Sequence, residues 1–150
     1  MGKIYDMALK QKNKYSGTIC WRLAKHCAVA EKHLNPDETP IYAFGGQKND
    51  DWKNFFDSCV VVVTNKRLLV AQKNVFPGYS FSSITPDLYN DLQVYTSIFW
   101  GKVVVDTVKE VITISNLSKA AIPEIETNIT EFMMEAKQKY QKPDDKKKDE

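Results

Sequence analysis

Two cysteines and two histidines in the first quarter of the chain are of the types that bind zinc or act in nucleophilic catalysis. Cys20 and Cys27 are seven residues apart, and His26 and His33 have the same spacing. Seven residues of helix make about two turns, too far for either pair to share one ion. His26 and Cys27 are neighbours, which point about 100° apart on a helix and therefore do not pair as base and nucleophile. We expect no metal site and predict that the cysteines pack as small apolar residues.

Basic residues gather at one predicted turn and on the segment after it. Lys66 and Arg67 lie in the turn, and Lys73 follows on the second arm of the hairpin. Such groups would contact a phosphate or an acidic peptide. Basic side chains at exposed turns are also commonly just solvated, so both interpretations stay open.

An apolar run, Ile98-Phe99-Trp100, precedes Gly101. On a loop tip, these side chains would form a hot spot for a partner or a shallow wedge into a membrane. In a continuing strand, alternate residues would belong to the core. We expect at least one of the three in the core, and Trp100 to be partly exposed because indole usually keeps a polar contact.

Other chemistry finds no support in the sequence. It contains no glycine-rich phosphate loop, paired-carboxylate signature or serine-nucleophile elbow. We therefore expect a non-enzymatic protein with no cofactor and infer no small-molecule substrate. The formal charge is +2, and the aromatic residues are not interleaved with a basic stripe, which argues against nucleic-acid binding.

The totals predict one folded domain. The chain has 150 residues, of which 43% are apolar and 27% charged. Its three cysteines, which include Cys59, cannot all pair with one another, so buried reduced thiols in the cytoplasm are expected. The charged first residues do not resemble a signal peptide, and the longest apolar runs are far below the ~18 residues that span a bilayer.

Residues 1–37 are expected to be helical and to form an extension. The sequence predicts a short, separate helix over residues 3–14. Ser16-Gly17-Thr18 would break the helix there and cap the start of the next one. A second apolar stripe from Ile19 to Leu34 ends at Asn35-Pro36-Asp37.

From Pro40 onward, the apolar residues follow the pattern of β-strands. A hairpin is clearest at Cys59–Ala71, where two β-rich runs flank a polar turn in which Asn65 fits a left-handed conformation. Gly45-Gly46 and Gly101 are expected to end or separate strands. About seven short strands result, which predicts a small antiparallel barrel or sandwich. The other expected strands are 41–44, 79–84, 92–97, 102–106 and 111–115.

The last expected element is a helix over 122–140, with Ser118 as a possible cap and Pro123 in the first turn. Its apolar stripe includes Ile125, Ile129, Phe132 and Met133, and must lie against other residues. Residues 141–150 are almost entirely charged and polar and are expected to be a disordered tail.

The order of these elements resembles the pleckstrin-homology superfold, and its details resemble the bacterial domains of the YokE-like type. The resemblance covers residues 38–140 and implies an α+β, mainly β fold, a seven-stranded antiparallel barrel closed by the C-terminal helix. The segments that carry the resemblance are 61–69, 98–105 and 111–116, followed by the closing helix.

The resemblance implies a module that binds lipids, peptides or proteins. Many relatives that bind phosphoinositides carry basic residues on the first strands, but here Lys48 and Lys53 are offset by Asp50 and Asp51. We therefore predict a protein partner or a homo-oligomer, with strand edges and the N-terminal helix as docking elements. The alternative is weak binding to an anionic membrane surface through Lys66, Arg67, Lys73, Phe99 and Trp100.

Overall fold

The computed structural model describes residues 2–48, 57–75 and 78–148, and the side chains of the last helix as far as residue 138. Two helices precede seven strands, and a single turn of 3-10 helix leads into a long final helix. The elements are α1 (Lys3–Lys14), α2 (Leu23–His33), β1 (Pro40–Gln47), β2 (Ser58–Thr64), β3 (Leu68–Lys73), β4 (Tyr79–Ile84), β5 (Tyr89–Thr96), β6 (Trp100–Thr107), β7 (Val111–Ser118), η1 (Lys119–Ala121) and α3 (Ile122–Lys148).

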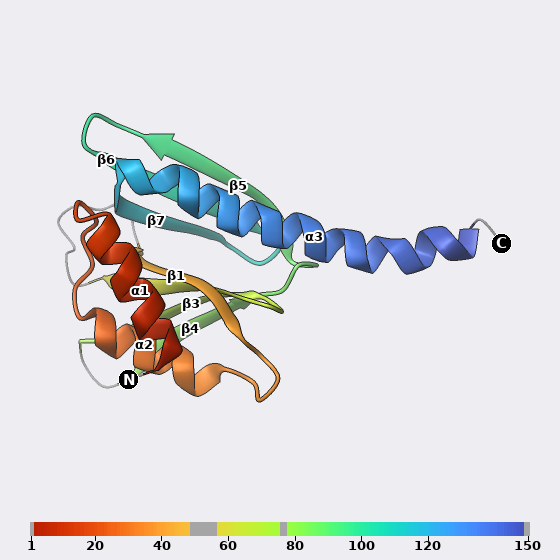
Figure 1. Ribbon diagram of the computed structural model, residues 1–150, viewed down its shortest axis with the longest axis horizontal. Helices are drawn as coiled ribbons and strands as arrows, with labels where there is room; N and C mark the ends of the chain where they lie inside the picture. Colours follow the sequence, from red (N-terminus) through yellow and green to blue (C-terminus); the bar gives the residue numbers. More distant parts are fainter. Residues whose placement is uncertain (1, 49–56, 76–77, 149–150) are drawn as a thin grey trace.

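The seven strands form one antiparallel sheet in the order β4-β3-β2-β1-β7-β6-β5. Each strand pairs with its neighbour in sequence, except where β1 pairs with β7 and where β4 and β5 become the two edges. The sheet curls so that β1 to β4 and β5 to β7 form two walls, and α3 lies along the opening between them (Figure 1). This arrangement confirms the expected seven-stranded barrel closed by a C-terminal helix.

The inner core lies between the two walls and α3. Val61 and Val63 of β2 face Val103 and Val105 of β6 across this space, within one buried cluster. The helix contributes the predicted stripe, since Ile125, Ile129 and Met133 are fully buried and Phe132 packs at the margin. Burial of a large aliphatic side chain contributes about 1.5–3 kcal/mol, so the stripe fixes α3 against the sheet.

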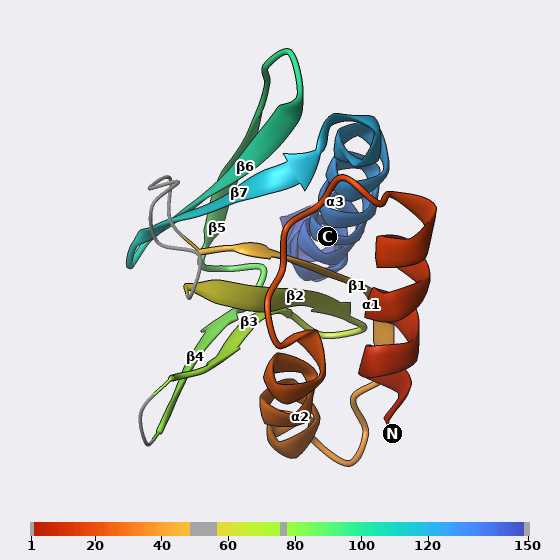
Figure 2. The ribbon, with the colours of Figure 1, turned by 90° about the vertical axis from the view of Figure 1, so that its left-hand side faces the viewer.

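A second core lies on the outer face of β1, β2 and β3, where α1 and α2 pack (Figure 2). Ile4, Ala8 and Ala30 from the helices meet Val60 and Val62 of β2 there. Every residue of β2 is buried. Both faces of this strand are covered, which is the reason that its valines form an unbroken run rather than an alternating one.

The N-terminal helices are therefore part of the folded body. We predicted that the N-terminal amphipathic helix would dock on a partner or a second copy, but its apolar face is covered by the chain's own sheet. The predicted helix over residues 3–14 is confirmed. The second helix begins later than the stripe suggested, at Leu23, after Arg22 in a left-handed conformation with φ 59°. Thr18 does not cap it and instead accepts a hydrogen bond from the Ser118 N–H.

Glycines do not end strands where the sequence suggested. Gly45 and Gly46 lie inside β1, and Gly101 lies inside β6. A Cβ on Gly45 would lie 2.6 Å from Cys20 Sγ in the outer core, and one on Gly46 would lie 2.6 Å from Ile114 Cγ2 in the inner core. The glycines therefore permit close approach from both faces rather than a turn.

The final helix also differs from its predicted end. Its backbone stays helical beyond Tyr140 as far as Lys148, through most of the segment expected to be a disordered tail. Lysine and glutamine are good helix formers, but Pro143 lacks a backbone N–H and opposes the helix at this point, so local propensity does not explain the extension. Among the helices that the structure describes, none has both the length and the apolar character to cross a membrane.

Candidate functional site

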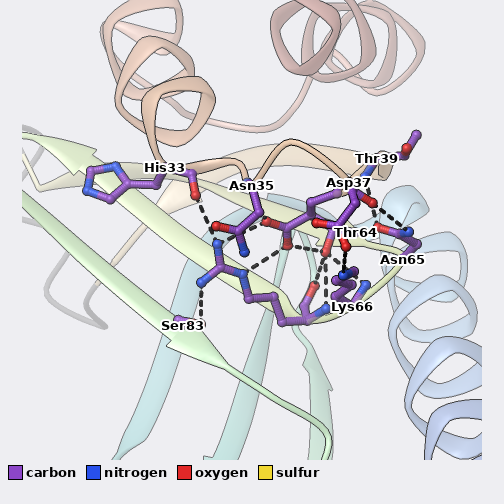
Figure 3. Close-up of polar contacts among 10 residues, drawn as sticks. His33, Asn35, Asp37, Thr39, Thr64, Asn65, Lys66 and Ser83 are labelled. Carbon is purple, nitrogen blue, oxygen red and sulfur yellow. Dashed lines mark hydrogen bonds and ion pairs between the residues drawn. The ribbon is translucent and has the colours of Figure 1, made fainter.

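The β2–β3 turn carries two of the predicted contact residues, and Arg67 is committed to the fold. Its Nε and Nη2 atoms donate to the two carboxylate oxygens of Glu38, each at 2.9 Å. Nη1 donates to Ser83 Oγ and Nη2 to the His33 carbonyl, both at 2.9 Å (Figure 3). The Arg67 side chain is 16% exposed and that of Glu38 is 0% exposed. The guanidinium therefore joins the β2–β3 turn to β4, to the end of α2 and to the segment before β1.

Glu38 is held as a carboxylate by this network. Burial would raise its pKa, but hydrogen bonds from Arg67, from Thr64 Oγ1 at 2.6 Å and from the Asn35 N–H at 3.1 Å outweigh burial and lower the pKa below its ordinary value. A buried ion pair of this kind is tolerated only when the hydrogen-bonding groups of both charges are satisfied. The pair is thus a structural feature of the turn, although a small part of the Arg67 side chain remains exposed to solvent.

Lys66 and Asn65 also bind the neighbouring loop. Lys66 forms an exposed ion pair with Asp37. The Asn65 side chain accepts the Thr39 N–H at 2.8 Å, and its own N–H donates to the Thr39 carbonyl. Asn65 does not adopt the predicted left-handed conformation, since the non-glycine residues with positive φ in the described chain are Arg22 and Asn116. It is required for hydrogen bonding and not for its φ.

A cavity of about 580 Å³ lies beside this turn, between the loops and α3. Asn35, Asn65, Lys66 and Arg67 supply its polar wall, and Phe132 of α3 supplies apolar surface. Asn65, Lys66 and Arg67 already have side-chain partners within the fold, and Glu135 adds a carboxylate to the wall, so the cavity offers an anionic ligand few unpaired cations.

At the tip of the β5–β6 hairpin, by contrast, three apolar side chains are exposed to solvent. Ile98 is 81% exposed, Phe99 73% and Trp100 43%. Our expectation that at least one of them belongs to the core is wrong, because the chain turns at Ser97–Trp100 and none of the three side chains is buried. Trp100 is the least exposed of the three, and its ring lies at 65° to that of Phe99 with the centroids 6.0 Å apart.

The turn and the hairpin tip lie at opposite ends of the sheet. Pro40 at the start of β1 pairs with Thr64 beside the β2–β3 turn. Gln47 at the other end of β1 pairs with Ser115 of β7, close to the β7 residue that pairs with Trp100. Lys66 and Arg67 therefore do not share a surface with Phe99 and Trp100.

Lys73 and Lys48, which are also predicted as contact residues, lie away from the β2–β3 turn. Lys73 ends β3, six residues after Arg67, which is about 20 Å along an extended strand. Lys48 follows β1, and its N–H donates to the Asp57 carbonyl at 2.7 Å. Lys53 lies outside the described residues.

The cysteines and histidines serve the fold. All three cysteines are free and buried, and burial raises the pKa of Cys20 to about 11 and of Cys27 to about 12, with that of Cys59 raised further. His26 accepts the Lys73 N–H at Nδ1 and therefore donates from Nε2 to the Trp21 carbonyl. Within the described ranges, no group of three or more His, Cys, Asp or Glu residues could hold a metal ion.

Sequence reasoning missed two features. Glu38 and Arg67 are far apart in the chain, so no local pattern announces their pairing. Lys25 and Lys32, which line a groove between α2 and the β3–β4 hairpin, share one face of α2 at a spacing of seven, a signal that was present in the sequence.

A curled antiparallel sheet closed by a C-terminal helix defines the pleckstrin-homology-like class, whose members are generally non-catalytic binding modules. The family described as "Bacterial PH domain" matches residues 34–131, and the chain belongs to this family. Both α1 and α2 lie before the matched segment. The YokE-like subtype stays a prediction.

Solved structures show the same fold. A pleckstrin homology domain from Shewanella amazonensis SB2B is 17% identical with a TM-score of 0.50, and the match covers 81% of this chain and 96% of that one. A DUF1696 family protein with a pleckstrin-homology domain from Shewanella loihica PV-4 is 16% identical with a TM-score of 0.50, covering 75% and 97%. At these identities the likeness establishes the fold. No curated protein matches the chain.

Proposed function

We propose that this chain is a non-enzymatic binding module that contacts a protein partner, or a second copy of itself, through the tip of the β5–β6 hairpin. The observation that carries the proposal is the joint exposure of Ile98, Phe99 and Trp100. Three neighbouring large apolar side chains in water are unfavourable unless a contact covers them, and buried aromatic anchors dominate protein interfaces.

The surroundings of the tip fit an interface. β5 is an edge strand, so its outer backbone groups are open to an added strand. Tyr95 is exposed on β5, and Lys102 Nζ lies 5.1 Å from the centre of its ring. An apolar centre with an aromatic and cationic margin is the usual arrangement of a protein contact. The free, buried thiols fit the reducing cytoplasm as the place of action.

Photo-cross-linking in the source cell tests this proposal. A benzoylphenylalanine at Phe99 should give a defined adduct, either with another protein or with a second copy. Met134 of α3, also an exposed apolar residue, provides the matched control position and should give none. Equal adducts at both positions, or no adduct at Phe99, would contradict the proposal.

Weak association with an anionic membrane is the second candidate, since aromatic tips also insert into the lipid interface. Its charge would come from Lys102 of β6, because Lys66 and Arg67 lie at the other end of the sheet and are paired. Co-sedimentation with phosphatidylglycerol vesicles at low and physiological salt separates the two. Membrane binding would fall steeply with salt, whereas an apolar protein contact would change little.

A further inference from the structure

A groove separate from the hairpin tip lies between α2 and the β3–β4 hairpin. It has a volume of about 420 Å³. Lys25 and Lys32 of α2 stand exposed on one side, and Lys73 and Tyr79 of the sheet lie on the other. Ala28 and Val29 of α2 supply apolar surface between them. The groove is thus amphipathic and basic.

The three ammonium groups have no acidic partner among the described residues. Across the described part of the chain, Lys25, Lys32 and Lys73 form no salt bridge. The residues that line the groove include no carboxylate. Lys66 and Arg67 at the β2–β3 turn, by contrast, each face an acidic partner. The groove therefore keeps a positive potential that an anionic ligand would reduce.

The walls of the groove are fixed by contacts within the protein. His26 of α2 accepts the Lys73 N–H at 2.9 Å, which ties the helix to the end of β3. The His33 ring stacks on Phe81 of β4, with the centroids 4.0 Å apart, and meets the edge of Tyr79 at 5.1 Å. A preformed site loses less conformational entropy on binding than one that must be ordered.

The spacing of the charges suits an extended acidic chain. Lys25 and Lys32 are seven residues apart on a helix, about 10.5 Å along its axis. Side chains on one face of an extended peptide lie about 6.7 Å apart at positions i and i+2 and about 13 Å apart at i and i+4, so the flexible side chains of glutamates at alternate positions can reach both ammonium groups. β4 borders the groove and is the other edge of the sheet, so it also offers backbone groups to an extended chain.

We propose that this groove binds an acidic, extended segment of a protein partner. The site involves α2, which lies outside the matched family segment, and none of the residues of the β5–β6 hairpin tip. Its success or failure is therefore independent of the function proposed above.

Fluorescence anisotropy with a labelled peptide of alternating glutamate and valine tests the proposal on the full chain. The wild type should bind it more tightly than the same peptide with glutamine for glutamate. The variant Lys25→Gln/Lys32→Gln/Lys73→Gln should bind about tenfold more weakly. The matched control, Lys3→Gln/Lys109→Gln/Lys119→Gln, removes the same charge at exposed positions elsewhere and should bind like the wild type.

Circular dichroism of each variant shows whether it is folded, and all six substituted lysines lie outside the two cores. Equal weakening in the two triple variants would overturn the proposal, because it would mean non-specific charge attraction. Absence of peptide binding would overturn it as well. If vesicles of phosphatidylcholine with phosphatidic acid bind through the three groove lysines while the peptide does not, the groove serves a lipid surface instead.

Discussion

Strands β2 and β6 are both valine-rich, but they occupy different surroundings. β2 is buried at every position, because the inner core covers one face and α1 and α2 cover the other. β6 alternates between buried and more accessible positions. The wall of β1 to β3 is therefore enclosed on both sides, whereas the wall of β5 to β7 buries mainly its inner face. Among the described residues, the outer face of the β5–β7 wall thus has no second layer over it.

The two hairpin turns follow the same division. The β2–β3 turn carries charges that the sequence marks as contact groups, but the fold pairs them with Glu38 and Asp37. The β5–β6 turn carries apolar residues that the core does not take. An exposed turn is thus a candidate contact only when its chemistry is not already satisfied within the chain.

Removal of residues 1–37 should have the largest effect. It would expose the outer face of the β1–β3 wall, including Val60, Val62 and Leu69. We expect the remaining chain to lose cooperative unfolding in urea, followed by circular dichroism, or to aggregate. A truncated chain that unfolds cooperatively at the wild-type midpoint would show that this wall does not need its second layer.

Replacement of Arg67 by methionine should be the most damaging single substitution. It leaves the buried Glu38 carboxylate without its cation, which typically costs about 3–5 kcal/mol of unfolding free energy. Lys66→Met is the matched control and should change little, because the pair with Asp37 is exposed. Urea denaturation of both variants measures the difference, and similar losses would contradict the structural role of Arg67.

The two glycines of β1 test the coverage of both faces. Gly45→Ala would press on Cys20, and Gly46→Ala on Ile114. We expect each to destabilise the protein by about 1–3 kcal/mol. Gly17→Ala is the control, since its Cβ would lie 3.6 Å from Ser118 in ordinary contact. If Gly45→Ala were as stable as Gly17→Ala, the outer layer would not be closely packed.

Acidification should loosen the link between α2 and the sheet. Burial lowers the pKa of His26, so the unfolded chain binds its proton more readily than the folded one. The His26 contribution is therefore present above the ordinary histidine pKa of about 6.5 and declines as the pH falls below it, by at most about 1.4 kcal/mol per pH unit. Urea midpoints across this range should fall less in His26→Gln, and parallel pH profiles would contradict this assignment.

Phe99→Ser should have the smallest effect on stability. Its side chain leaves the sheet and lies in neither core, so the unfolding free energy should stay within about 0.5 kcal/mol of the wild type. Val103→Ser in the adjoining β6 strand is buried and should be strongly destabilised. A large loss in Phe99→Ser, measured by urea denaturation, would mean that the tip has a role in folding.

The sequence predicts the parts of the fold that depend on local pattern. The hairpin at Cys59–Ala71, the first helix and the apolar stripe of α3 all follow from the spacing of apolar residues. The unbroken valine run in β2 also carried the information that both faces are covered, but nothing local says what covers the second face. The predicted strand ends at Gly45-Gly46 and Gly101 are wrong, because glycine occurs both at turns and where neighbouring side chains approach the backbone closely.

The candidate surfaces were less predictable, because pairing across the fold decides which charges remain free. Arg67 and Lys73 look alike in sequence, yet one meets a buried carboxylate brought from 29 residues away and the other lines an open groove. The exposure of Phe99 depends on where the chain turns between β5 and β6, and Gly101 suggested a later break than the actual one.

The affinity of the protein that cross-links at Phe99, or of a second copy, tests the central claim most directly. It should be measured with the wild type, Phe99→Ser and Lys66→Ser. The loss of an aromatic anchor should weaken binding by at least about tenfold in Phe99→Ser, and Lys66→Ser should bind like the wild type. Weaker binding by Lys66→Ser with unchanged binding by Phe99→Ser would contradict the claim and place the contact at the β2–β3 turn.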